Sequence, residues 1–471
     1  MKTTILKFAD GLRGSYWFLP TVMALGAVLL AGGMILLDTY KGSDWMDGLP
    51  WLYAARPDGA RQVLSAISGS MITVAGTVFS VTIAAVVYAS GQYGPRLLSN
   101  FMSDRGNQVT LGTFIATFVY CLLVLRTIRS AGEAGAGAGF VPNLALLVGV
   151  ALALCSIAVL IFFIHHVPSQ LHINVVIEDI GDKLLKEIDN RFPRFIGAPQ
   201  PDDNGQDDAA RVPATFQLDA SQADGARRAL VAAKDTGYLQ LIDDDAVMVV
   251  AREHDLVLRL QYQPGDFIHA GRTLVEAWPP ERCDDDTAAA IGAVFSVGSR
   301  RTALQDLRFL VDELVEIAAR ALSPGVNDPF TAVTCLDWLG AAISDLAGRE
   351  LPSHLRLDGD GALRVITHPV TFAGFMERGF GALSQYCATD MVASLRFIRA
   401  LGEVSVGCDD PERLKNLDDH AQKLVVLVRE NLKGFNRDRV IERADQLRRA
   451  MAEPDYKRRL RDSGAWLGGT A

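Results

Sequence analysis

A stripe of small and hydroxyl-bearing side chains runs along residues 62–95, a 34-residue segment without Asp, Glu, Lys or Arg. Its members recur mostly at steps of three and four, the spacing of one helix face. Such a stripe can line an aqueous path across a membrane. It can also let helices pack closely, with hydroxyls bonding across the seam, and in a symmetric oligomer the two roles coincide. The stripe comprises Ser70, Thr73, Gly76, Thr77, Ser80 and Ala84.

Charged residues beside the apolar segments form a second candidate group. As a collar at a pore mouth they would select ions, and the sign of the selected ion stays open. The alternative is that they anchor helix ends to lipid headgroups. These residues are Arg96, Asp104, Arg105, Arg126 and Arg129.

The segment SPGVNDPF at residues 323–330 is the third candidate. Ser323, Pro324, Asn327 and Asp328 could border a groove for a partner or ligand. Asp328 followed by Pro329 is also typical of a helix start, where Asp caps the first turn and Pro suits the first helical position. A general-base role for Asp328 lacks a His or Lys partner nearby in the sequence.

No other group of residues has the spacing of a known catalytic or metal site. His165, His166 and His172 match no zinc signature. The acidic runs 243–245 and 284–286 are typical of turns, although carboxylates are also ligands of divalent cations. We expect no enzymatic activity, no cofactor and no bound metal.

The elements that position these residues begin with four long apolar segments. About 20 apolar residues cross a bilayer as a helix. The sequence predicts spans at about 16–37, 70–90, 109–125 and 142–164, within a membrane domain of residues 1–168. Four spans place both termini on one side. Lys and Arg are balanced between the loops, so charge bias does not orient the chain.

Composition separates the two ends of the chain. Of 471 residues, the first 165 carry a net charge of +3 and the remainder a net charge of −12. An acidic C-terminal part argues against nucleic acid as a partner. Six scattered cysteines without a CxxC pair indicate reduced thiols. We therefore expect an inner membrane protein of a bacterium with cytoplasmic N- and C-termini.

The C-terminal part is predicted to be α+β. Residues 169–212 would form an amphipathic helix and a polar linker. Residues 213–282 contain the β-prone runs ATFQLDA, GYLQLID, AVMVVAR and LVLRLQY, which predict a small β-barrel module. Residues 283–471 repeat apolar positions at helical spacing and would form a helical domain.

Residues 79–126, FSVTIAAVVYASGQYGPRLLSNFMSDRGNQVTLGTFIATFVYCLLVLR, and residues 320–340, RALSPGVNDPFTAVTCLDWLG, resemble a family of bacterial integral membrane proteins. That family is catalogued as a domain of unknown function, "predicted membrane protein". The resemblance implies a bacterial inner-membrane protein with four spans and a cytosolic tail. It implies no activity, substrate or cofactor.

Two functional hypotheses follow. The first is a homo-oligomeric channel or passive transport protein, with ions as candidate substrates, whose second span lines the path and whose cytosolic domain regulates it. It rests on the hydroxyl stripe and on the absence of ionisable residues within the spans, which coupled transporters usually carry. The second is a membrane-anchored scaffold or sensor whose cytosolic domain binds a partner or ligand.

Overall fold

The computed structural model describes residues 15–41, 56–94, 104–130, 140–170, 172–191, 198–199, 212–213, 216, 228–349, 351, 353–368 and 370–463. The chain divides into two compact units. We call Phe8–Val175 the membrane unit and the unit built from Val176 onward the C-terminal unit.

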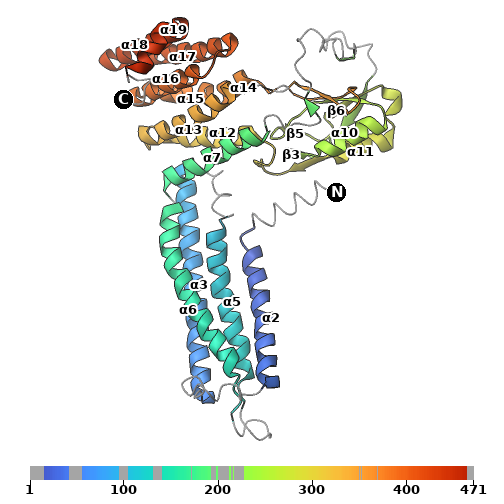
Figure 1. The fold of residues 1–471 in the computed structure, drawn as a ribbon, viewed down its shortest axis with the longest axis vertical. Helices are drawn as coiled ribbons and strands as arrows, with labels where there is room; N and C mark the ends of the chain where they lie inside the picture. The colour runs from blue at the N-terminus through green and yellow to red at the C-terminus, as the bar shows by residue number, and fades with distance from the viewer. Residues whose placement is uncertain are drawn as a thin grey trace. The chain divides into compact units, whose positions relative to one another are not determined.

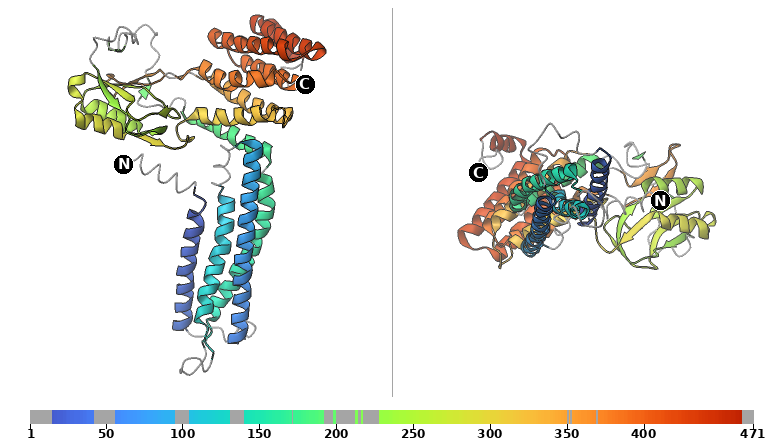
Figure 2. Two further views of the ribbon diagram at one scale, coloured as in Figure 1. Left: turned by 180° about the vertical axis from the view of Figure 1, so that it is seen from behind. Right: turned by 90° about the horizontal axis from the view of Figure 1, so that it is seen from below.

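Four long helices make up the described part of the membrane unit: α2 (Phe18–Lys41), α3 (Pro57–Tyr93), α5 (Arg105–Thr127) and α6 (Asn143–Gln170). Helix α5 packs against each of the other three, as Figure 1 and the view along the helices in Figure 2 show. The four predicted apolar segments fall largely on these helices, although α3 begins 13 residues before residue 70, and their role as spans stays a prediction. Helix α6 continues through Pro168 to Gln170, beyond the predicted end at residue 164.

Hydrogen bonds between helices of the membrane unit fix how the helices are aligned along one another, which apolar packing alone would not do. Tyr120, buried on α5, donates its hydroxyl hydrogen to the carbonyl of Ala145 on α6 at 2.9 Å. Asp38, on α2, accepts hydrogen bonds from the backbone N–H groups of Leu144 and Ala145 at 3.1 and 2.9 Å. Those groups belong to the first turn of α6, which has no intrahelical partner for them.

Five helices among the described residues are long and apolar enough to cross a membrane by length and composition. They are α2, α3, α5, α6 and α13 (Pro329–Ala347). Helix α13 has the lowest mean hydropathy of the five, 1.2, and the largest buried share of its apolar window, 56%, with α5 next at 50%. The chain is thus a membrane protein with several apolar helices and an α+β C-terminal unit.

The C-terminal unit contains two sheets, drawn beside α10 and α11 in Figure 1. The larger has the order β1-β8-β9-β4-β6-β2, and its pairs are antiparallel except β4 with β9. The smaller has the order β5-β3-β7 and is antiparallel. The strands are β1 (Ala198–Pro199), β2 (Ala229–Ala232), β3 (Gly237–Ile242), β4 (Val257–Leu260), β5 (Phe267–Ile268), β6 (Thr273–Trp278), β7 (Phe295–Gly298), β8 (Leu355–Leu357) and β9 (Leu363–Ile366).

Helices follow and interleave with these strands. Helix α13 packs between α12 and α16, and Gly340 allows its backbone to approach Ala400, whose Cβ would lie 3.2 Å from a Cβ at position 340. The remaining elements are α7 (Ile173–Arg191), α10 (Asp244–Glu253), η4 (Pro280–Arg282), α11 (Asp285–Ala293), α12 (Leu307–Ala321), α14 (Phe372–Met376), the π-helix η5 (Glu377–Gly381), α15 (Ala382–Cys387), α16 (Met391–Val406), α17 (Pro411–Asn431), α18 (Gly434–Ala452) and α19 (Pro454–Asp462).

The sequence expectations for this unit have mixed outcomes. GYLQLID and LVLRLQY form strands β3 and β4, and the amphipathic helix is α7. The strand predicted for AVMVVAR is wrong, because this run forms helix α10. Asp243 caps the helix by accepting a hydrogen bond from the N–H of Ala246. Val247 and Ala251 are buried one helical turn apart. ATFQLDA lies almost wholly outside the described residues. A barrel within 213–282 stays a prediction, and β7, β8 and β9 come from beyond residue 282.

Candidate ligand-binding site

A cavity of about 740 Å³ lies within the C-terminal unit. Most of its lining comes from three stretches that are distant in sequence: residues 260–264 at the end of β4 and in the loop after it, residues 304–308 at the start of α12, and residues 367–378 around α14 and η5. Glu187, Ile242, Asp244 and Arg356 complete the lining. Pockets that take small organic molecules are typically about 300–1,000 Å³, with apolar walls and a few convergent polar groups. The apolar part of this lining includes Leu260, Leu307 and Phe375.

A chain of ion pairs supports one side of the cavity. Arg378 donates from Nε and Nη2 to the two oxygens of Asp312 at 2.6 and 2.7 Å. Arg301 contacts both Asp312 and Asp306, with Nε 3.0 Å from Asp306 Oδ2. Arg308 Nε lies 3.3 Å from Asp306 Oδ1. The chain therefore links two cavity-lining guanidinium groups, those of Arg308 and Arg378, through a scaffold of buried acids.

Burial and the neighbouring arginines shift the pKa of Asp312 in opposite directions. Burial favours the neutral form of Asp312, but hydrogen bonds from Arg378 and Arg301 favour the carboxylate and leave its pKa below the ordinary value. The Asp306 side chain is only 1% exposed and accepts from two arginines. Such a pair is costly to break, because either partner left alone is a buried charge.

Gly265 lets the β4–β5 loop close over this scaffold. Its φ of +95° lies in the left-handed region, and a Cβ there would collide with the carboxylate of Asp306. Arg308 holds the same loop by donating to the carbonyl of Pro264 at 2.7 Å and to Asp266 at 2.9 Å. The loop, the helix start and the ion chain are thus one connected structure.

Arg356 contributes a third guanidinium group to the lining. The residue is 3% exposed and donates to the carbonyls of Ser353 and Leu355. Burial lowers its pKa to about 10, so it remains protonated at neutral pH. The lining therefore holds three guanidinium groups, one of them buried, together with acids and an apolar wall.

The π-helix η5 carries two of the lining residues, Glu377 and Arg378. π-Helical turns are rare and are often found at functional sites. Glu377 accepts a hydrogen bond from Lys423 at 2.8 Å, and His420 Nε2 lies 3.4 Å from the same oxygen. The Lys423 hydrogen bond is the largest influence that lowers the pKa of Glu377.

The hydroxyl stripe lies on α3 and faces away from the other helices of the chain. Ser70, Thr73, Gly76, Thr77, Ser80 and Ala84 are all exposed within the single chain. The hydroxyls of Thr73, Thr77 and Ser80 donate to carbonyls four residues earlier at 2.9, 3.1 and 2.9 Å. A lining role for the stripe stays a prediction.

The second candidate group is dispersed. Asp104 caps α5, accepting from the N–H groups of Gly106 and Asn107, and lies 2.9 Å from His166 Nε2 on α6. Arg105, Arg126 and Arg129 are exposed. Arg96 lies outside the described residues.

The third candidate group has a structural role in the described structure. Asp328 caps α13, accepting from the Thr331 N–H at 3.2 Å, which confirms the predicted N-cap. Asn327 has a φ of +51° in the turn before it. Ser323 donates to the carbonyl of Arg320 at 2.6 Å. These residues and Pro324 do not line the cavity, and a groove beside them stays a prediction.

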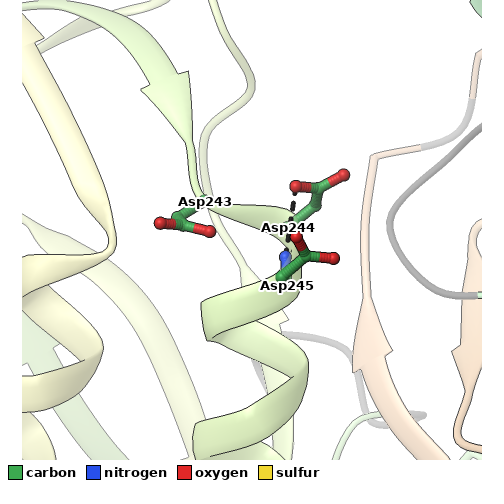
Figure 3. A group of neighbouring side chains, drawn as sticks. All are labelled: Asp243, Asp244 and Asp245. Atoms are coloured by element: carbon green, nitrogen blue, oxygen red, sulfur yellow. Dashed lines mark hydrogen bonds between the residues drawn. The ribbon is translucent and has the colours of Figure 1, made fainter. Parts of the chain in front are cut away.

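Asp243, Asp244 and Asp245 form an acidic cluster at the start of α10, with carboxylate oxygens within 4.8 Å of one another. Figure 3 shows Asp244 and Asp245 pointing away from Asp243. Asp243 is the N-cap of α10, and the Asp245 N–H donates to Asp244 at 3.1 Å. Helix capping explains this cluster without a metal ion.

Comparison with known proteins places the chain in a family. The family model described as "Predicted membrane protein (DUF2254)" matches residues 13–403. The chain belongs to this family. An uncharacterized protein of Mycobacterium bovis is similar, with 32% identity over 409 residues that cover 86% of this chain and 74% of the relative. An uncharacterized protein of Mycobacterium tuberculosis matches to the same extent. No solved structure matches the chain.

Sequence reasoning missed the cavity of this family member. One signal was present: Arg301, Asp306, Arg308 and Asp312 lie within twelve residues, at or beside the apolar face that begins α12. Charges in that position are rarely buried unless they pair with one another. Their partners on η5 and in the β4–β5 loop are too distant in sequence for the pattern to identify.

Proposed function

We propose that the chain is a membrane-anchored receptor that binds a small molecule in the cavity of its C-terminal unit. The observation that carries the proposal is the cavity itself, where an apolar wall faces guanidinium groups held by buried acids. Pre-organised charged groups of this kind reduce the ordering cost of binding. The role is one of binding, and no catalytic step is assigned to the cavity.

For the membrane unit we propose four spans, α2, α3, α5 and α6, in a bacterial inner membrane with both termini in the cytoplasm. Helix α13 has the lowest mean hydropathy of the five helices and packs against α12 and α16 within the C-terminal unit, which supports its exclusion from the spans. Alkaline phosphatase fused after residue 191 should be inactive, whereas fusion within 131–139 should be active. The opposite pattern would reverse the orientation.

Native mass spectrometry of the full chain released from its own membranes tests the receptor proposal. We expect a bound small molecule on the wild-type protein. Leu304→Trp, which adds bulk in the cavity lining, should remove it. Phe435→Trp, at a residue 73% exposed on α18, is the matched control and should retain it. A wild-type protein without any bound molecule, also after incubation with a cell extract of small molecules, would count against the proposal.

A homo-oligomeric channel is the second candidate, supported by the stripe on α3. The described helices of the chain leave it exposed, and a Cβ at Gly69 or Gly76 would meet no atom within 4 Å. A second copy could pack there. Conductance in planar bilayers that changes with Thr77→Trp but not with Leu154→Trp, at an exposed residue on α6, would support this function. Absence of conductance from the purified oligomer would oppose it.

A further inference from the structure

We infer that the cavity of the C-terminal unit takes a small organic molecule that carries an oxyanion, a carboxylate or a phosphate, and an apolar portion. This inference rests on the proposed receptor function and specifies the chemistry of its ligand. It depends on which members of the ion chain face the cavity and which lie outside its lining.

The arginines line the cavity, and several of their acidic partners do not. Arg308 and Arg378 are lining residues, whereas Asp266 and Asp312, which hold them, are not. Arg301, which neutralises Asp306 and Asp312 together, is also outside the lining. The members of the ion chain that line the cavity, Arg308, Arg378 and Asp306, therefore carry a net charge of +1, whereas the ion chain as a whole is balanced.

The two guanidinium groups retain hydrogen-bond capacity. The contacts of Arg378 use Nε and Nη2, and those of Arg308 also use Nε and Nη2. In the described part of the chain, Nη1 of each has no hydrogen-bond partner. Guanidinium donors fixed by a carboxylate scaffold suit a carboxylate or phosphate, since charge-assisted hydrogen bonds are short and strong.

The lining also holds four acids, Glu187, Asp244, Asp306 and Glu377, and each of them interacts with another group. Glu377 binds Lys423, Asp244 accepts from the N–H of Asp245, and Glu187 interacts with a neighbouring group. Asp306 is shared by Arg301 and Arg308. Arg356 adds a further buried cation to the lining. Leu260, Leu307 and Phe375 provide an apolar surface for the rest of the ligand.

The test uses four probes of matched size on the full chain in phosphatidylcholine nanodiscs: phenyl phosphate, benzoate, benzyl alcohol and benzylamine. Saturation-transfer NMR, with empty nanodiscs as background, gives each Kd. We expect the two anions to bind at least about tenfold more tightly than the other two, the scale of one charge-assisted hydrogen bond. Phenyl phosphate binding well ahead of benzoate would identify a phosphate ligand, and equal binding a carboxylate ligand.

Two variants test whether the anions bind in the cavity, and control variants show whether a loss of binding comes from a loss of folding. Arg378→Gln should weaken anion binding about tenfold or more, but it also removes a partner of Asp312. His368→Glu places a negative charge at an exposed lining residue outside the ion chain and should abolish anion binding. His269→Glu, at an exposed residue outside the lining, and Arg437→Gln, on α18, are the matched controls and should bind like wild type.

Equal or tighter binding of benzyl alcohol or benzylamine would overturn the oxyanion inference and leave the receptor proposal standing. So would anion binding that His368→Glu and Arg378→Gln leave unchanged, or no binding of any probe. A molecule that co-purifies with the protein and has no acidic group would likewise refute the ligand class alone. The receptor proposal fails under a different result, namely that the protein binds no small molecule at all.

Discussion

Asp312 on α12 accepts hydrogen bonds from two arginines that lie 77 residues apart in sequence, Arg301 before α12 and Arg378 on η5. One carboxylate thus ties the start of the helical part of the C-terminal unit to the π-helix beside the cavity. Because both arginines depend on it, the loss of this carboxylate should affect stability and binding together.

Asp312→Ala should therefore destabilise the C-terminal unit. Removing one member of a buried ionic group leaves uncompensated charge and typically costs about 3–5 kcal/mol. Thermal unfolding of the full chain in nanodiscs measures the effect. Asp455→Ala, at an exposed residue on α19, is the control and should have little effect. A change no larger than the control's would show that the ion chain contributes little.

The contribution of Asp312 should also depend on pH in a defined direction. Its folded-state pKa is lowered, so its stabilisation is complete above the unfolded-state pKa of about 3.9 and is lost as pH falls through the folded-state value. The difference in unfolding midpoint between wild type and Asp312→Asn should be constant from pH 7 to pH 5 and shrink below about pH 4. A difference that grows on acidification would contradict this assignment.

Gly265→Ala should disturb both the fold and the cavity. The substitution incurs left-handed strain of about 1–2 kcal/mol and places a methyl group against the Asp306 carboxylate. Gly271→Ala separates the two effects, since Gly271 has a φ of +81° but open space at its Cβ position. We expect the larger loss of stability at position 265, with weaker ligand binding only there. Equal losses at both positions would exclude the steric contact.

Asp328→Ala should lower stability by about 1 kcal/mol, the typical value of a helix N-cap, without loss of ligand binding. The carboxylate caps α13 and does not line the cavity. Thermal unfolding and the bound mass in native mass spectrometry measure the two effects. Loss of the bound molecule from a stably folded variant would instead support the ligand groove predicted around Ser323–Asp328.

Tyr120→Phe tests the membrane unit. It removes the hydroxyl that donates to Ala145 and leaves a buried carbonyl with one partner fewer, at a cost of about 1 kcal/mol. Tyr88→Phe, at an exposed residue on α3, is the matched control. Unfolding in mild detergent with increasing sodium dodecyl sulfate compares them. Equal stability of both variants would mean that lipid or water satisfies Ala145.

Local sequence patterns predicted the elements well where one physical cause dominates. Long uncharged segments predicted α2, α3, α5 and α6, and the Asp-Pro pair predicted the start of α13. The prediction failed at residues 246–252, whose β-branched composition indicated a strand. These residues form α10 instead, because Asp243 caps the helix and the apolar side chains are buried at helical spacing. Propensity is a weak guide when capping and packing oppose it.

The cavity could not be predicted from local sequence patterns, for a different reason. Its walls combine residues near 262, 306 and 378, and only tertiary packing brings these together. Gly265 was visible in the sequence as part of a turn, but the need for glycine there comes from Asp306, forty-one residues later. The hydroxyl stripe, conversely, was fully visible in the sequence. Its partner could not be identified, because none of the helices in the described part of the chain covers it.

The most direct test of the receptor function is a cryo-EM map of the full-length protein purified from its native membranes without added ligands. The account predicts non-protein density in the cavity, in contact with the guanidinium groups of Arg308 and Arg378. A map of sufficient resolution in which side chains fill that space, or in which only water occupies it, would contradict the account.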